Sequence, residues 1–138
     1  DGTENPCSRV TITSHTLASA LAAHGIVARK SRRLAFPSIQ PGLLHHFMRG
    51  YFDGDGSIYM VGPNGAMSVT GNRAFIEQYQ RHLMRECGLA ETKLQCRKSP
   101  ATPTLSYGGR HQLRRIRGFL YRDATVFLTR KQARFAAI

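Results

Sequence analysis

Hydrophobic residues recur at helical spacing in some stretches of the chain and alternate with polar residues in others. Between residues 43 and 52 the apolar positions follow the spacing of one helix face, which predicts an amphipathic helix. These positions are Leu43, Leu44, Phe47, Met48, Tyr51 and Phe52. Similar patterns predict helices at 72–88, at 109–121 and within 123–138, and strands at 57–62, 65–71, 91–99 and 104–107.

The predicted elements follow one another in the order helix, hairpin, helix, hairpin, helix. Two hairpins predict a four-stranded antiparallel sheet with the helices on one face, which is an α+β fold of the type αββαββα. We assign residues 41–138 to one complete unit of this kind.

The N-terminal residues 1–40 carry a similar but shorter pattern. Alternation at 8–14 predicts a strand, followed by a short helix and a basic segment that contains Lys30. The same order recurs over residues 103–135, where the basic segment contains Lys131. We therefore interpret residues 1–40 as the back part of a preceding, incomplete repeat.

The net charge points to a partner. Lys and Arg number 20 and Asp and Glu number 8, which gives a formal charge of +12 and a pI near 10.7. The cations are dispersed through patterned segments, so the charge belongs to a folded surface. Such an excess favours a polyanion as partner, most often nucleic acid; a merely basic soluble protein is the alternative.

The uncovered face of the predicted sheet is the first candidate for contact with double-stranded DNA. On the second hairpin, alternation directs to this face Lys93, Gln95, Arg97, Thr104 and Ser106. If Ile58, Met60 and Val69 point inward, the first hairpin adds Tyr59, Val61, Asn64 and Ser68, and the strand at 8–14 adds Arg9 and Thr11. Strands can enter the major groove of DNA, but an ordinary solvated sheet face would show the same pattern.

Cysteine usage and hydropathy indicate the compartment. Cys7, Cys87 and Cys96 are far apart and odd in number, which argues against a zinc site or a disulfide framework and fits a reducing environment. No apolar run is long enough for a transmembrane helix, and no signal peptide is recognisable. We expect an intracellular protein, in the cytoplasm, nucleoid or an organelle, that is not secreted and has no membrane partner.

Two aspartates, Asp53 and Asp55, end the helix predicted over residues 43–52. An EF-hand calcium loop starting at Asp53 fails, because its sixth position is Ile58 rather than glycine and its twelfth is Asn64 rather than glutamate. A helix-to-strand turn explains the neighbouring glycines, but carboxylates at a helix C-terminus oppose the helix dipole and cost stability. Their placement therefore favours a hard cation such as Mg²⁺.

The stretch "MRGYFDGDG" (48–56) resembles the LAGLIDADG motif of homing endonucleases. Gly50, Asp53, Asp55 and Gly56 match the motif, Met48, Tyr51 and Phe52 are apolar where it is apolar, and Gly54 replaces a small alanine. Arg49 departs from the motif, which usually has alanine there. The order of the predicted elements agrees with this family over the rest of the chain, so the resemblance implies a homing-endonuclease-like fold.

The resemblance also implies roles at the motif itself. Gly50 and Gly54 would lie at a seam where two motif helices pack through small residues. Asp55 and the carbonyl that Gly56 matches would bind Mg²⁺ at the scissile phosphates. Mn²⁺ would substitute for Mg²⁺, and Ca²⁺ would bind without supporting cleavage. Asp53 matches an aspartate that helps to finish the helix rather than a metal ligand.

Further positions of the family lie outside the motif. A lysine late in each repeat lies near the reacting phosphates; Lys131 matches that position, and Lys30 resembles its counterpart in the preceding repeat. A polar residue that orders water often follows the second strand. This chain has Gly71 there, which would weaken cleavage.

The sequence thus predicts a site-specific endonuclease that hydrolyses double-stranded DNA at a long target site with Mg²⁺. One motif makes half of a site, so a second motif helix would come from a homodimer mate or from a missing N-terminal repeat; the repeat-like pattern near the N-terminus favours the latter. Two alternatives remain. One is a non-catalytic DNA- or RNA-binding protein on the same fold, maturase-like or regulatory, and the other is a basic RNA-binding protein unrelated to the family.

Overall fold

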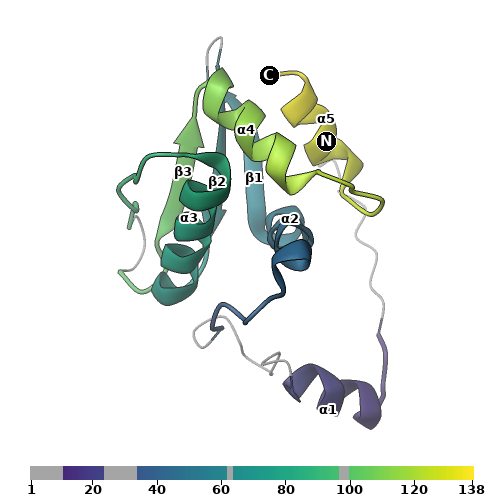
Figure 1. Ribbon diagram of the computed structural model, residues 1–138. Helices are drawn as coiled ribbons and strands as arrows, with labels where there is room; N and C mark the ends of the chain where they lie inside the picture. Colours follow the sequence, from purple (N-terminus) through teal and green to yellow (C-terminus); the bar gives the residue numbers. More distant parts are fainter. Residues whose placement is uncertain (1–10, 24–33, 62–63, 97–99) are drawn as a thin grey trace, which may run out of the picture.

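The computed structural model describes residues 11–23, 34–61, 64–96 and 100–138, and these residues have an α+β architecture (Figure 1). They form the helices α1 (His15–Ala23), α2 (Leu44–Asp55), α3 (Arg73–Cys87), α4 (Arg110–Leu120) and α5 (Thr129–Ala136). They also form a 3₁₀ turn, η2 (Pro41–Leu43), and the strands β1 (Gly56–Val61), β2 (Asn64–Thr70) and β3 (Thr104–Gly108). The helices and strands predicted between residues 43 and 136 are confirmed, with one exception in the sheet.

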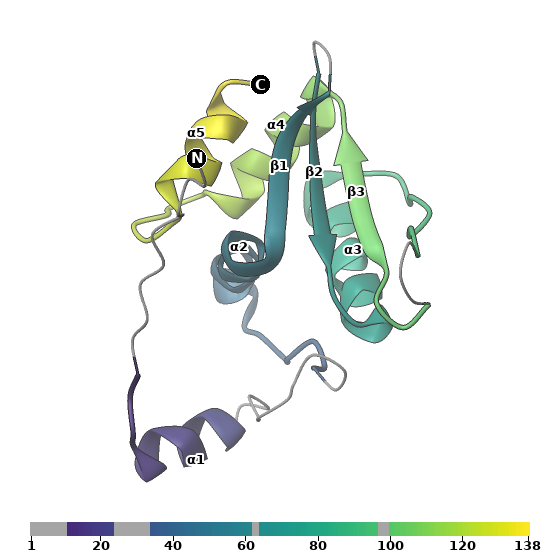
Figure 2. The same cartoon turned by 180° about the vertical axis from the view of Figure 1, so that it is seen from behind.

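The three strands form an antiparallel sheet in the order β1-β2-β3. Figure 1 shows α3 and α4 in front of the sheet, and Figure 2, from behind, leaves the other face of the sheet in view. Ser57 lies opposite Ser68, which lies opposite Ser106 on β3. The next residues along these strands, Ile58 on β1 and Val69 on β2, point to the opposite face of the sheet and are buried under the helices. This confirms the inward direction expected for Ile58 and Val69, whereas Met60, also expected to point inward, is 57% exposed near the end of β1, beyond the cover of the helices.

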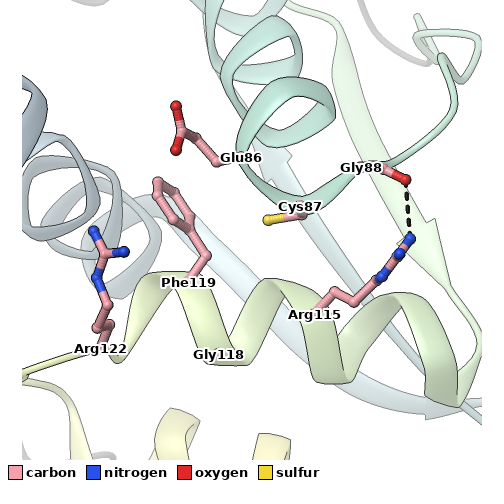
Figure 3. Close-up of a pocket in the computed structure, with 7 residues that line it drawn as sticks. All are labelled: Glu86, Cys87, Gly88, Arg115, Gly118, Phe119 and Arg122. Carbon is pink, nitrogen blue, oxygen red and sulfur yellow. Dashed lines mark hydrogen bonds between the residues drawn. The ribbon is translucent and has the colours of Figure 1, made fainter.

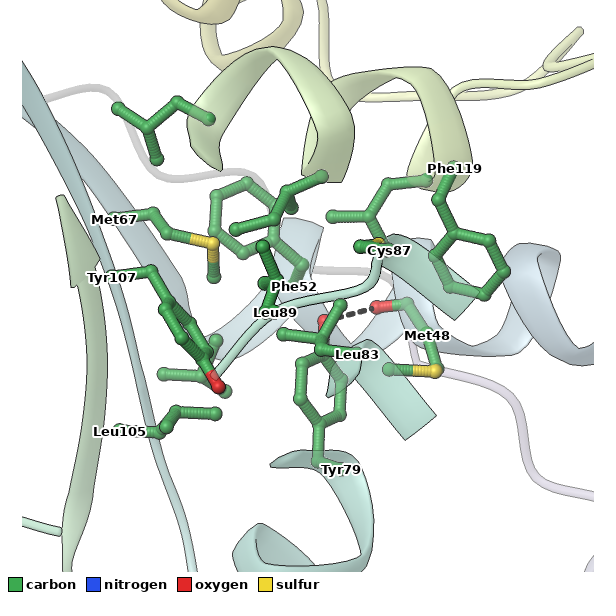
Figure 4. Close-up of a cluster of buried hydrophobic side chains, with 14 of the residues drawn as sticks. Met48, Phe52, Met67, Tyr79, Leu83, Cys87, Leu89, Leu105, Tyr107 and Phe119 are labelled. Carbon is green, nitrogen blue, oxygen red and sulfur yellow. Dashed lines mark hydrogen bonds between the residues drawn. The ribbon is translucent and has the colours of Figure 1, made fainter. Parts of the chain in front are cut away.

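The hydrophobic core lies between the sheet and the helices (Figure 4). Phe52 and Met48 of α2 and Tyr79 of α3 are among its largest fully buried side chains. The Tyr79 hydroxyl donates a hydrogen bond of 3.0 Å to the carbonyl of Met48, which satisfies a polar group that would be costly to bury alone. This hydrogen bond joins α2 to α3 within the core.

Helix α3 begins and ends at the residues that its sequence indicates. The Asn72 side chain accepts a hydrogen bond of 3.0 Å from the Phe75 N–H, as an N-cap does. At the other end Gly88 has φ of 59°, a left-handed conformation that favours glycine. Local sequence is sufficient to define this element.

The predicted fourth strand at 91–99 is not formed in the described residues, and the four-stranded sheet is reduced to three strands. Gln95 alone makes an isolated bridge to Thr104, with backbone hydrogen bonds of 2.9 and 2.8 Å. Three residues earlier, the Thr92 carbonyl accepts a hydrogen bond of 2.7 Å from the Gln80 side chain of α3. At Thr92 the backbone is therefore bonded to a side chain of α3 instead of to a neighbouring strand. Residues 97–99 lie outside the described residues.

The N-terminal part differs from its prediction. Residues 11–14 form no strand, although they alternate, because no described strand lies beside them to complete a ladder. Helix α1 follows with the Ser14 hydroxyl accepting from the Leu17 N–H at 3.2 Å, and none of its residues is buried. The assignment of residues 1–40 to a preceding repeat stays a prediction. In the described parts of the chain, no helix is both long and apolar enough to cross a membrane.

Candidate active site

The C-terminus of α2 passes directly into β1 at Gly56. A Cβ atom at this position would lie 2.3 Å from the Phe52 ring and 2.6 Å from the Phe52 carbonyl oxygen. Neither atom is the end of a flexible chain, so only glycine fits between the helix and the strand. The sequence thus brings the last turn of α2, with its two aspartates, to a sharply defined junction.

Lys131 of α5 is buried at this junction. Its ammonium donates hydrogen bonds to the carbonyls of Phe52, Asp53 and Gly56, at 2.7, 2.8 and 2.5 Å. A cation at the negative end of a helix is favourable, and here it binds three carbonyls at the junction, of which that of Phe52 also accepts the Gly56 N–H. Burial lowers the pKa of Lys131, as does Arg130, while Asp53 and Asp55 raise it. The Lys131 ammonium and the Gly56 carbonyl are both predicted to belong to the site, and in the structure the ammonium is hydrogen-bonded to the carbonyl.

Asp53 is held by two donors from the segment that follows α4. One carboxylate oxygen accepts from the Tyr121 hydroxyl at 3.2 Å, and the other accepts from the Leu128 N–H at 2.9 Å. Leu128 is the residue before α5, so Asp53 fixes the start of the helix that carries Lys131. The role expected of Asp53, to help finish α2, stays a prediction; the bonds observed here go to the segment before α5.

Asp55 has different surroundings. Its carboxylate is exposed, and within the described residues it makes no hydrogen bond or ion pair. It opens onto a cavity of about 340 Å³ that is lined by Leu34, Tyr51, Asp55, Thr70, Gly71, Asn72 and Thr102. Asp55 is therefore accessible to a ligand from outside the chain.

The two glycines of α2 that are predicted to lie at a helix seam have no close neighbours. Gly50 and Gly54 are exposed, and a Cβ atom at either position would meet no atom within 4 Å in the described structure. They lie four residues apart, so they share one helix face. Among the residues that the structure describes, none packs so closely that glycine is required at these two positions.

Arg49 is a structural residue that the sequence marked only as a departure from the motif. It is 6% exposed, and its guanidinium donates to the carbonyls of Val126 and Leu120 at 3.1 and 3.0 Å. A third nitrogen lies 2.9 Å from His46 Nδ1. Arg49 thus ties α2 to the end of α4 and the loop after it. A lone cation on the buried side of an amphipathic helix was the available signal for this role.

The candidate DNA-contact residues of the three strands share the face of the sheet that points away from the helices. They are Tyr59, Val61, Asn64, Ser68, Thr104 and Ser106, which are exposed or half-buried. Their neighbours on this face are also uncharged: Ser57, Ala66, Thr70 and Gly108. Lys93 and Gln95 are exposed beside β3, and Thr11 is exposed before α1. Arg9, Lys30 and Arg97 lie outside the described residues.

A second cavity, of about 470 Å³, lies between the end of α3 and helix α4 (Figure 3). Its wall includes Cys87, Arg115 and Arg122, and Arg115 donates a hydrogen bond of 3.0 Å to the Gly88 carbonyl. Burial, with Glu86, raises the pKa of the Cys87 thiol to about 12, so this sulfur is not a reactive thiolate at neutral pH. None of the predicted site residues lines this cavity.

The donor set at the end of α2 fits part of a Mg²⁺ site. Among the described residues, no group of three His, Cys, Asp or Glu side chains could hold a metal ion. Proteins often hold Mg²⁺ through one or two carboxylates, while waters and substrate phosphates fill the other positions. Asp55 supplies one exposed carboxylate, which fits a site that a second protein surface and a phosphate complete.

The assignment of this site rests on the residues and their geometry. Asp55 is the accessible group, Asp53 and Lys131 hold the junction around it, and Gly50 and Gly54 leave the adjoining helix face open. Comparison of the chain with protein-family models gives no match, and comparison with curated proteins also gives none.

Proposed function

We propose that this chain is one half of a LAGLIDADG-type homing endonuclease, with a homing-endonuclease-like fold, that hydrolyses double-stranded DNA at a long target site with Mg²⁺. The observation that carries the proposal is the contrast between two aspartates on one helix turn. Two donors of the chain bind Asp53, whereas the carboxylate of Asp55 is exposed and unbound within the described residues. A carboxylate that opposes the helix dipole and has no internal partner is available to an external cation.

The reaction forms a bond between a water oxygen and phosphorus and breaks the bond from phosphorus to the leaving oxygen. The attacking water loses a proton to solvent, and the leaving oxygen gains one. Mg²⁺, when bound, neutralises phosphate charge and makes a water more acidic. Asp55 would hold this ion. Lys131 binds three carbonyls of the junction, so we assign it a positioning role: it fixes where the Asp55 carboxylate lies.

The second half of the site would come from another motif helix. Gly50 and Gly54 leave room on α2 for the backbone of that helix to approach closely, as small residues do where helices pack tightly. The partner helix is that of a second copy of the chain or of a preceding repeat. The uncharged outer face of the sheet, with Tyr59, Ser68 and Ser106, would then lie against the DNA grooves.

The test is Mg²⁺-dependent cleavage of a supercoiled plasmid library that carries a randomised insert. The protein is used at concentrations that permit self-association and as a tandem of two copies. We expect linear product with Mg²⁺ or Mn²⁺ but not with Ca²⁺, and loss of that product in Asp55→Asn. Asp123→Asn is the matched control, because Asp123 is exposed in the loop after α4 and its positive φ of 51° suits asparagine.

A non-catalytic DNA- or RNA-binding protein on the same fold is the second candidate. The bond between Lys131 and the Gly56 carbonyl favours it, because the resemblance to homing endonucleases implies that Lys131 lies near the reacting phosphates and that the Gly56 carbonyl binds the cation. Sequence-selective binding by the tandem protein, with no Mg²⁺-dependent cleavage and no effect of Asp55→Asn, would replace the first proposal with this one.

A further inference from the structure

The cavity beside Asp55 is lined by Tyr51, whose hydroxyl lies at the end of β2 beside Gly71. Tyr51 and Asp55 are four residues apart on α2, so both side chains reach the same side of the helix, and both line the cavity. The Tyr51 hydroxyl donates a hydrogen bond of 3.1 Å to the Thr70 carbonyl at the end of β2. Tyr51 therefore spans from the helix to the strand directly beside the candidate metal ligand.

The Tyr51 hydroxyl occupies the space of a side chain at position 71. A Cβ atom on Gly71 would lie 2.4 Å from the Tyr51 oxygen, which is far inside van der Waals contact. The tyrosine cannot easily move aside, because its ring packs on Phe75 with centroids 4.3 Å apart. The polar group at the end of β2 thus comes from α2, and glycine at 71 is the residue that leaves room for it.

The other polar side chains of the cavity are largely occupied. The Asn72 amide donates to the Leu34 carbonyl at 2.6 Å and accepts from the Phe75 N–H at 3.0 Å. The Thr70 hydroxyl pairs with that of Thr104 at 2.8 Å. Tyr51 has used its single donor on Thr70, so the lone pairs of its oxygen are what remains for a further partner.

We propose that the Tyr51 hydroxyl is a positioning residue that orients the attacking water in this cavity, together with the Asp55 carboxylate. Two acceptors, the Tyr51 oxygen and an Asp55 oxygen, bind the two protons of one water, and this arrangement turns the lone pairs of its oxygen toward the phosphate. The inference rests on the proposed nuclease function and deepens it. It assigns to Tyr51 the water-ordering task that a side chain at position 71 cannot perform here.

The test compares three variants in the same cleavage assay. Tyr51→Phe removes the hydroxyl. Tyr51→Phe/Gly71→Ser moves a hydroxyl to the vacated space, where the next neighbour, an Ile76 methyl, would lie 3.2 Å from the new Cβ and can shift slightly. Tyr107→Phe is the matched control, because Tyr107 also donates one hydrogen bond to a backbone carbonyl, at 3.0 Å to Ala90, and does not line this cavity.

We expect Tyr51→Phe to lower the single-turnover cleavage rate about tenfold or more. DNA affinity and Mn²⁺ affinity should be unchanged within about twofold, because the proposed partner of Tyr51 is the water and neither the DNA nor the ion. The double variant should recover most of the lost rate, and Tyr107→Phe should cleave like the wild type. A purely structural Tyr51 would instead give equal losses in Tyr51→Phe and Tyr107→Phe and no recovery in the double variant, which overturns the inference.

A structural readout does not depend on cleavage. Crystals of the wild type should show an ordered water within hydrogen-bond distance of both the Tyr51 oxygen and an Asp55 oxygen, and crystals of Tyr51→Phe should lack it. A dry cavity in the wild type overturns the inference. The two levels are separable: full activity of Tyr51→Phe beside an inactive Asp55→Asn removes the Tyr51 role alone, whereas an inactive wild type removes the nuclease proposal.

Discussion

The buried and the open parts of α2 differ in what holds them. On the buried side, Arg49, Phe52 and Asp53 are bonded to residues of the last third of the chain. On the open side, a Cβ atom added at Gly50 or Gly54 would meet no atom within 4 Å, and the Asp55 carboxylate has no internal partner in the described structure. On one part of α2 the described structure contains contacts that account for the residue types, and on the other part it contains none. The second part is where the proposed cation and partner helix would bind.

The largest expected effect is on the bonded side, at Lys131. Lys131→Met removes three hydrogen bonds to carbonyls at the end of α2, and we expect it to lower the free energy of unfolding by about 3 kcal/mol. Arg130→Met, on the exposed neighbour in α5, should change it by less than about 0.5 kcal/mol. Urea unfolding followed by circular dichroism measures both, and equal values would remove the distinction between the two sides.

The two aspartates give the next largest difference. In Asp53→Asn the side chain no longer offers a charged oxygen to each of its two donors, the Tyr121 hydroxyl and the Leu128 N–H. We therefore expect the free energy of unfolding to fall by about 1.5 kcal/mol. Asp55→Asn should stay within about 0.5 kcal/mol of the wild type while it abolishes Mg²⁺-dependent cleavage. A destabilised Asp55→Asn would mean that its carboxylate has a role in the folded chain itself.

Alanine at the open glycines should stabilise the isolated chain. Gly50→Ala and Gly54→Ala gain helix propensity without a clash, so we expect each to raise the free energy of unfolding by about 0.5–1 kcal/mol. Both should weaken self-association or cleavage, because the added methyl group lies at the seam. Gly118→Ala in α4, whose Cβ also meets no atom, is the control: it should give the same stabilisation and leave association, measured by sedimentation, unchanged.

The smallest expected effect is on how the free energy of unfolding depends on pH through Tyr51, a half-buried residue of α2. Burial, and to a lesser extent Asp55, raises the pKa of Tyr51 to about 12. The unfolded chain releases this proton first, so the stability that Tyr51 contributes is complete below pH 10 and is lost as the pH rises toward 12. Tyr51→Phe should flatten the decline in unfolding free energy over that window, while Tyr79 and Tyr121, whose pKa values are also raised, keep part of it.

Asp55→Asn sharpens the same measurement. It should lower the pKa of Tyr51 only slightly in an ultraviolet titration, because burial is the larger cause and remains. A return of the Tyr51 pKa to its ordinary value in Asp55→Asn would show that the cavity is more open than its walls indicate.

Local patterns predicted the elements that depend on neighbours in the chain. Helix α2, the β1–β2 hairpin and α3 follow from apolar spacing, turn residues and the Asn72 and Gly88 caps. The strand expected at 91–99 depends on a partner, and there the Gln80 side chain takes the Thr92 carbonyl, so alternation alone was misleading. The segment 11–14 shows the same limit, because alternation does not provide a neighbouring strand.

By itself, the sequence determined that two aspartates, set among glycines, end an amphipathic helix in a strongly basic chain, and that Asp55 is the candidate ligand. Only the tertiary structure decided which groups are free. Lys131 lies 78 residues from Asp53 in sequence and Leu128 lies 75 residues from it, and both bind it. Contacts over such separations depend on how α5 packs against the end of α2, which no local pattern encodes. Packing therefore bonds Asp53 and Lys131 to other parts of the chain and leaves Asp55 exposed.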